Sequence, residues 1–149
     1  MPALFLINGP NLNLLGEREP EIYGTTTLAD CVALAESATL ERGWSFSSAQ
    51  FNSEGEMIEA IHSARTAADA IVINPGAFTH YSFAIADALA AFSGTIIELH
   101  LSNVHAREEW RRISVISPVA TGIVAGLGSV GYAIAAEAAI AVHTERPSR

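Results

Sequence analysis

The chain has 149 residues, of which 16 are acidic and eight are basic, so its formal net charge is −8. All eight basic residues are arginines, and the longest basic run is Arg111-Arg112. The absence of lysine excludes Schiff-base chemistry and the lysine of a phosphate-binding P-loop. Without clustered cations, a nucleic-acid partner is also disfavoured, although local arginines can still attract a small anion.

Length and cysteine content indicate one domain spanning residues 1–149. A chain of about 150 residues buries roughly 68–70% of its unfolded surface without a disulfide or metal staple. The single cysteine, Cys31, excludes an intramolecular disulfide and is typical of a reducing compartment. The opening apolar run Ala3–Ile7 is too short for a signal peptide, and no segment approaches the ~20 apolar residues of a membrane span. We therefore expect a cytoplasmic protein without a membrane partner.

Strand and helix patterns alternate along the chain. The patterns predict strands at Ala3–Ile7, Trp44–Gln50, Ala70–Ile73, Thr95–Leu99 and Gly122–Ala125, of which Trp44–Gln50 is expected at an edge. The first helix, between the first two strands, carries the apolar stripe Leu28, Val32, Ala35 and Thr39, and the second, after the capping box Ser53-x-x-Glu56, carries the stripe Met57, Ile58, Ile61 and Ala64. Further helices are predicted at 82–92, 106–112 (short) and 129–142. All strands except the edge strand are expected to be buried on both faces. This alternation predicts an α/β fold, a flavodoxin-like doubly wound parallel sheet of five strands in the order 2-1-3-4-5.

In such sheets the ligand lies beyond the carboxyl ends of the strands. Three loops rich in Asn, His and Gly follow the first, third and fourth strands, at Asn8–Asn13, Asn74–His80 and Glu98–His105. We therefore expect the functional site where these loops meet.

The segment 16–25 after the first strand carries charges and chain breakers that a core would not. Gly16 and Gly24 bound it, and Arg18 and Tyr23 lie five residues apart on it. A phenol has a pKa of about 10, so it becomes a base at neutral pH only where a nearby cation stabilises the phenolate. The segment is either a lid that carries an activated tyrosine or a solvated loop with one aromatic anchor.

Glu98 and His100 lie two residues apart at the end of a strand, which puts the carboxylate and the imidazole on one face. The carboxylate can fix the tautomer of the ring for work as a general acid. His105 adds a third potential metal ligand, but metal sites rarely use this spacing without a further ligand, so we expect no metal. On the neighbouring loop, His80 is expected to hydrogen-bond a substrate.

Two further segments have alternative readings. Arg111 lies on the expected helix 106–112, whose N-terminus would bind an anion together with the N–H groups of Leu101 and Ser102; a solvated helix face is the alternative. The string Gly126-x-Gly128-x-x-Gly131 matches the dinucleotide fingerprint, but it belongs to the last strand–helix unit rather than the first. We therefore expect these glycines to serve close packing.

Five strings keep the order and spacing found in one enzyme family. They are Ile7–Gly16, Arg18-Glu19-Pro20-x-x-Tyr23-Gly24, Asn52-Ser53-Glu54-Gly55, Asn74-Pro75-Gly76-Ala77-x-Thr79-His80 and Glu98-x-His100-x-Ser102-Asn103. With these motifs, essentially the whole chain resembles the type II 3-dehydroquinate dehydratases. One departure is Ala86, because many relatives carry arginine immediately before the aspartate that corresponds to Asp87.

The resemblance implies dehydration of 3-dehydroquinate to 3-dehydroshikimate in the shikimate pathway of aromatic amino acid biosynthesis. The reaction would be an anti elimination through an enolate, without a metal or organic cofactor. By resemblance, Tyr23 as phenolate, supported by Arg18, would remove the proton next to the ketone. Asn11 would stabilise the enolate oxygen through a water, and His100, oriented by Glu98, would protonate the departing hydroxyl.

The resemblance also implies substrate contacts and an assembly. Asn74, Leu101 and Ser102 match positions that bind the substrate carboxylate, while His80, Asp87 and Arg111 match positions that contact the ring hydroxyls. Asp87 is expected to come from a neighbouring subunit, because family members form dodecamers of four trimers. The alternative function is a non-catalytic small-ligand or nucleotide-binding domain of the flavodoxin-like fold.

Overall fold

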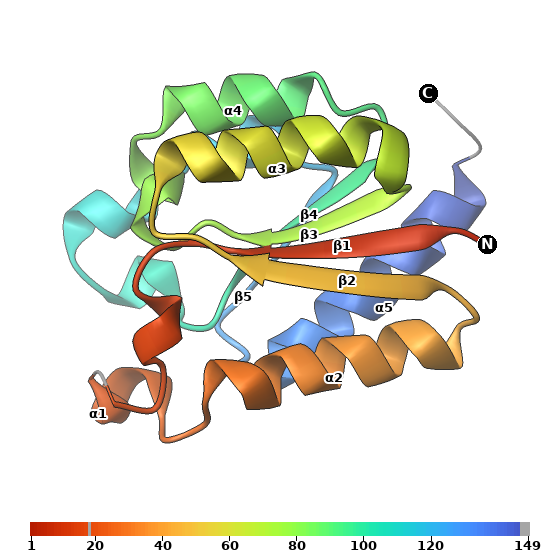
Figure 1. Cartoon of the computed structure of the whole chain (residues 1–149). Helices are drawn as coiled ribbons and strands as arrows, with labels where there is room; N and C mark the ends of the chain where they lie inside the picture. The colour runs from red at the N-terminus through yellow and green to blue at the C-terminus, as the bar shows by residue number, and fades with distance from the viewer. Residues whose placement is uncertain (18, 147–149) are drawn as a thin grey trace.

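The computed structural model describes residues 1–17 and 19–146, and of Tyr23 only the backbone. One parallel sheet has the strand order β2-β1-β3-β4-β5 (Figure 1). Its strands are β1 (Ala3–Asn8), β2 (Ser45–Gln50), β3 (Ala70–Asn74), β4 (Thr95–His100) and β5 (Gly122–Ala125). The predicted α/β fold and strand order are confirmed.

The helices alternate with the strands along the chain. The α-helices are α1 (Pro20–Tyr23), α2 (Leu28–Glu41), α3 (Glu54–Ala67), α4 (Phe83–Ala90) and α5 (Val130–Glu145). The short 3₁₀ helices are η1 (Leu12–Leu14), η2 (Gly76–His80), η3 (Val104–Ala106), η4 (Glu109–Arg112) and η5 (Ser117–Val119). Among the described residues, no helix is long and apolar enough to cross a membrane.

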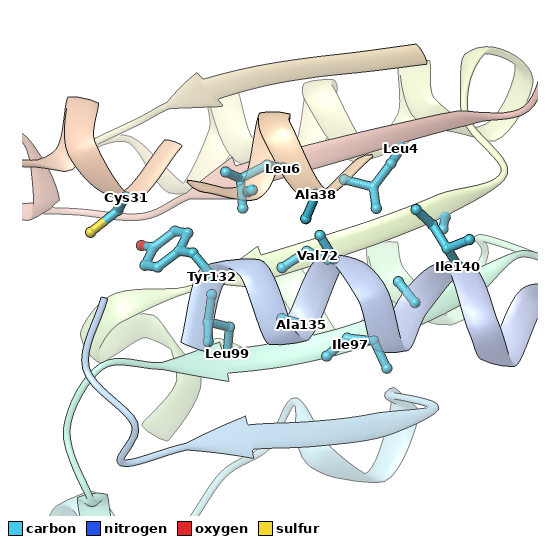
Figure 2. Close-up of a cluster of buried hydrophobic side chains, with 14 of the residues drawn as sticks. Leu4, Leu6, Cys31, Ala38, Val72, Ile97, Leu99, Tyr132, Ala135 and Ile140 are labelled. Carbon is cyan, nitrogen blue, oxygen red and sulfur yellow. The ribbon is translucent and has the colours of Figure 1, made fainter. Parts of the chain in front are cut away.

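Helices cover both faces of the sheet, α2 and α5 on one side and α3 and α4 on the other (Figure 1). Alternate residues of the strands therefore serve two cores. Leu4 and Leu6 of β1 pack in the core beneath α2 and α5, which Figure 2 shows, whereas Ile7 packs with Met57 of α3 in the other. Cys31 is fully buried in the first core, and burial raises the pKa of its thiol to about 11. The lone thiol is thus a core residue.

Helix starts follow local capping rules. At α2, Thr27 Oγ1 accepts a hydrogen bond from the Asp30 N–H and the Asp30 carboxylate accepts one from the Thr27 N–H, which completes a capping box that the sequence reading missed. At α3, Ser53 Oγ accepts a hydrogen bond from the Glu56 N–H (3.3 Å), which is one of the two hydrogen bonds of the predicted capping box. The stripe predicted for α2 faces the core: Ala35 and Thr39 are fully buried, and Leu28 and Val32 pack against the core while partly buried. Cys31 and Ala38 extend this buried face.

The prediction of a helix at 106–112 is wrong. The chain there forms η3 and η4, separated by extended backbone at Arg107 (φ −115°, ψ −158°). Asn103 Oδ1 accepts a hydrogen bond from the His105 N–H and so closes the first short turn. An extended residue interrupts the i→i−4 ladder, so no α-helical N-terminus exists here to bind an anion.

β2 and β5 are the two edges of the sheet, as the predicted order 2-1-3-4-5 requires. The expectation that β5 is buried on both faces is wrong. Ile123 of β5 is 57% exposed. An apolar run by itself does not distinguish an edge strand from a central one.

Candidate active site

A cleft lies beyond the carboxyl ends of β1, β3 and β4, the position that the fold predicts for a ligand. The strand ends are aligned there, since Asn8 of β1 pairs with Asn74 of β3. The cleft is lined by seven of the predicted site residues: Asn11, Asn74, His80, His100, Leu101, Ser102 and Arg111. The three loops singled out in the sequence therefore do form one site.

Glu98 lies behind the cleft, with only 1% of its surface exposed. Its carboxylate accepts hydrogen bonds from His100 Nε2 (2.5 Å), Ser117 Oγ (2.6 Å), Thr79 Oγ1 (2.8 Å) and Ser114 Oγ (3.0 Å). Burial by itself would raise the pKa of Glu98, but the hydrogen bonds from His100 and Ser117 outweigh it and hold the pKa below its usual range. The carboxylate thus fixes Nε2 of His100 as a donor and leaves Nδ1 available to a ligand.

His80 lies beside His100, with the two rings stacked at 6.4 Å between centroids. Its Nδ1 is 2.7 Å from the carbonyl oxygen of Ile113, and because a carbonyl only accepts, Nδ1 carries the hydrogen. Burial lowers the pKa of His80, and the hydrogen bond to Ile113 opposes this only in part. His80 is therefore neutral at pH 7, with Nε2 as an acceptor.

Asn74 ends the central strand β3 and is held on both sides of its amide. Nδ2 donates to the hydroxyl of Tyr132 in α5 (3.0 Å), and Oδ1 accepts from the Gly76 N–H (3.2 Å). The Tyr132 hydroxyl in turn donates to Oδ1 of Asn8 (2.8 Å), and burial raises the pKa of this phenol. The amide of Asn74 is thus locked before any ligand arrives.

Two arginines line the cleft. Arg107 donates through Nη1 to Ser102 Oγ (3.3 Å), and its Nη2 lies 3.7 Å from the Glu19 carboxylate. Arg111 donates through Nε to Glu108 (2.5 Å) and stacks at 4.1 Å over the ring of Trp110. The solvated-face alternative for Arg111 is wrong, since the side chain of Arg111 is only 13% exposed.

Arg107 was not among the predicted site residues. Residues four apart share one face of a helix, so the expected helix 106–112 already placed Arg107 beside Arg111, and this signal was overlooked. In the structure, η3 and η4 bring both side chains to the cleft. Arg107 and Arg111 bring two guanidinium groups to the wall of the cleft within an acidic chain.

Three predicted site residues are not placed in this cleft. Arg18 and the side chain of Tyr23 lie outside the described residues. Asp87 is exposed on α4 and does not line the cleft. Asp87 is therefore not part of the cleft of its own chain.

The glycine string before α5 does not offer its amides to a phosphate. The N–H groups of Gly126, Gly128 and Gly131 donate to the carbonyls of His100, Leu101 and Gly128. Gly126 and Gly128 have positive φ, and of the three only Gly131 packs closely on a strand, with Leu99 3.3 Å from a Cβ built there. The close-packing prediction therefore holds for Gly131, whereas Gly128 has open space around it.

In residues 1–17 and 19–146, no group of three or more His, Cys, Asp or Glu side chains has the geometry to hold a metal ion. Glu98 and His100 bond to one another, and His105 is exposed on η3.

The sequence and the fold both match known proteins. Residues 2–140 match the family model described as dehydroquinase class II. Catabolic 3-dehydroquinases of Verticillium alfalfae and Aspergillus clavatus are 54% and 53% identical to this chain, over 90% and 98% of it and 89% and 97% of their own lengths. The type II dehydroquinase structure from Propionibacterium acnes superposes with a TM-score of 0.87 at 46% identity, covering 91% of this chain and 94% of that one. The chain belongs to the class II dehydroquinase family.

Proposed function

We propose that this protein is a type II 3-dehydroquinate dehydratase, a lyase that converts 3-dehydroquinate to 3-dehydroshikimate. The observation that carries the proposal is the buried Glu98–His100 pair, whose imidazole lines the cleft together with Asn11 and Asn74. A general acid (His100), a group that can stabilise an oxyanion (Asn11) and a binding site for a carboxylate (Asn74) lie together beyond the carboxyl ends of the strands. This arrangement suits the elimination of water next to a ketone. The shikimate pathway is part of the same proposal.

In the proposed reaction, the phenolate of Tyr23, steadied by Arg18, removes the proton next to the ketone. The charge moves onto the ketone oxygen as an enolate, which Asn11 stabilises through a water. The enolate then collapses as the neighbouring C–O bond breaks, and His100 gives the departing hydroxyl its proton so that it leaves as water. Glu98 stabilises the positive charge that His100 carries before this step, because its carboxylate is 2.5 Å away.

The substrate contacts follow from the arrangement of the cleft. The fixed amide of Asn74 and the backbone of Leu101 and Ser102 hold the carboxylate of the substrate, and the neighbouring arginines supply a favourable field. His80 and Arg111 contact the ring hydroxyls. No metal or organic cofactor enters these steps.

We assign residues 16–25 as the lid of this single catalytic domain, 1–149. Its two boundary glycines have positive φ, +94° at Gly16 and +74° at Gly24, as expected of turning points at the ends of a loop. The pairing of Glu19 with Arg107 joins this segment to the opposite wall of the cleft. Closure would exclude water from the enolate.

The quaternary structure is a further part of the proposal. We expect a dodecamer of four trimers, in which Asp87 reaches a neighbour's cleft. Exposed apolar side chains near α4 and η4 support a subunit contact: Tyr81, Phe83, Trp110 and Ile113. Sedimentation would give the assembly directly.

The cytoplasmic location is also part of the proposal, and it rests on the single, buried cysteine.

The dehydratase proposal is tested by mixing metal-stripped protein with 3-dehydroquinate and following the ultraviolet absorbance of the conjugated enone product. We expect steady turnover by the wild type and loss of turnover in His100→Gln. His62→Gln is the matched control, because His62 is exposed on α3 away from the cleft. Absence of product from the folded wild type would favour the alternative of a non-catalytic ligand-binding domain.

A further inference from the structure

Asn11 has an unusual backbone for a residue with a side chain. Its φ of 69° and ψ of −4° lie in the left-handed region, which most residues avoid because of their Cβ atom. Its side chain lines the cleft and makes no capping hydrogen bond to η1, which it precedes. Asparagine adopts this region more readily than most residues, and contacts with the surrounding structure can favour it further.

Two side chains from the end of the edge strand β2 hold this backbone. Oδ1 of Asn52 accepts a hydrogen bond from the Asn11 N–H (3.0 Å) and a second from Nε2 of Gln50 (3.0 Å). Nε2 of Gln50 also donates to the carbonyl oxygen of Gly9 (3.0 Å). Gln50 thus orients the Asn52 amide. Together the two side chains form hydrogen bonds with the residues on either side of Pro10, Gln50 with Gly9 and Asn52 with Asn11.

The opposite side of the same segment is held by β3. The Gly9 N–H donates to the carbonyl oxygen of Asn74 (2.7 Å), and a Cβ on Gly9 would lie only 2.4 Å from the carbonyl oxygen of Pro75. Residues 9–11 are therefore fixed between the ends of two strands. The contacts that Gly9 and Asn11 make with the segment after β2 come from the side chains of Gln50 and Asn52. Substitution of these side chains therefore removes the hydrogen bonds without changing the backbone pairing of the sheet.

We propose that Asn52, oriented by Gln50, is a positioning residue that holds Asn11 in its left-handed conformation and so aims the Asn11 amide at the reacting centre. The inference rests on the proposed function, in which Asn11 acts on the enolate oxygen. Asn52 itself touches no substrate; it acts through the Asn11 N–H.

The first test compares Asn52→Ala with Asn52→Asp. Alanine removes the acceptor, whereas aspartate keeps an oxygen at the position of Oδ1. We expect Asn52→Ala to lower kcat roughly 10- to 100-fold, the loss typical of a displaced catalytic group. KM should change much less, because the substrate carboxylate is held by other residues. Asn52→Asp should stay close to the wild type, and Ser48→Ala, at an exposed position of β2, serves as the control.

The second test separates positioning from a general loss of structure. If Asn52 acts through Asn11, Asn52→Ala should cost little further kcat in an Asn11→Ala background. An equal loss of kcat in both backgrounds would overturn the proposal, as would a single variant Asn52→Ala with unchanged kcat. Thermal unfolding of each variant shows that the protein compared is folded.

A third measurement does not depend on activity. In a crystal structure of Asn52→Ala, the proposal expects Asn11 to leave the left-handed region; an unchanged φ would overturn it. If the wild type itself made no 3-dehydroshikimate, the proposed function would fail, and the crystal structure would still decide whether Asn52 holds Asn11.

Discussion

Tyr132 of α5 and Asn74 of β3 are joined by a buried hydrogen bond of 3.0 Å from Nδ2 to the phenol oxygen. The phenol in turn donates a hydrogen bond to Oδ1 of Asn8, so one hydroxyl links the ends of the strands β1 and β3. Tyr132 is fully buried, and no other partner can replace it from solvent. The last helix thereby determines how the amide of Asn74 is presented to the cleft.

Removal of this hydroxyl should destabilise the fold. In Tyr132→Phe, Nδ2 of Asn74 and Oδ1 of Asn8 lose their partner inside the core. We expect the free energy of unfolding to fall by about 1–3 kcal/mol, measured by urea denaturation. Tyr81→Phe is the control, because Tyr81 is exposed and the same change should alter stability by less than about 0.5 kcal/mol. Equal effects of the two variants would contradict this account.

Glu98 should make stability depend on acidic pH. Its pKa is held below its usual range in the native state, so the folded protein binds a proton less readily than the unfolded chain. The stabilisation is fully present above the unfolded value of about 4.3 and is lost as pH falls through the lower native value. The stability gap between wild type and Glu98→Gln should shrink as pH falls below about 5. A gap that widens on acidification would refute the assignment.

His80 should titrate below the ordinary histidine value of about 6.5. Because burial disfavours its charged form, the native state binds this proton less readily than the unfolded chain. Its contribution to stability is therefore complete above the ordinary value and declines as pH falls toward the native one. Nitrogen chemical shifts should report the Nδ1–H tautomer, with His80→Gln used to identify the resonance. An Nε2–H tautomer would be incompatible with donation to Ile113.

Gly9 should tolerate no side chain. In Gly9→Ala the new Cβ would meet the Pro75 carbonyl oxygen at 2.4 Å, so the ends of β1 and β3 must separate. Overpacking of this kind typically costs 1–3 kcal/mol, about what we expect in unfolding experiments. Gly55→Ala is the contrast: Gly55 lies in α3, where a Cβ would lie 3.8 Å from Ser53 Oγ, and alanine there should raise stability by up to about 1 kcal/mol. A stable Gly9→Ala protein would show that the strand ends can yield.

Much of the fold was accessible from the sequence because its signals are local. Buried strands such as Ala70–Asn74 read as apolar runs, and α3 shows both its N-cap and its apolar stripe. The strand ends then located the cleft, because ligands of parallel sheets bind beyond the carboxyl ends. Glu98 and His100 were paired correctly, since residues two apart on a strand share a face.

The errors fall where distant contacts override local preference. The segment 106–112 has helical composition, yet Arg107 is extended and turns toward Ser102 and Glu19. Gly122–Ala125 was expected to be buried on both faces, yet Ile123 is 57% exposed. Neither outcome is encoded in a short window of residues.

The sequence by itself determined the strand order, the edge of the sheet that carries the site and most of the residues in the cleft, because periodicity and strand ends are properties of neighbouring residues. Only the tertiary structure decided that Asn52 holds Asn11 across 41 positions and that Tyr132 holds Asn8 across 124. Hydrogen bonds between residues so far apart depend on where the sheet places them, and no pattern along the chain specifies that position.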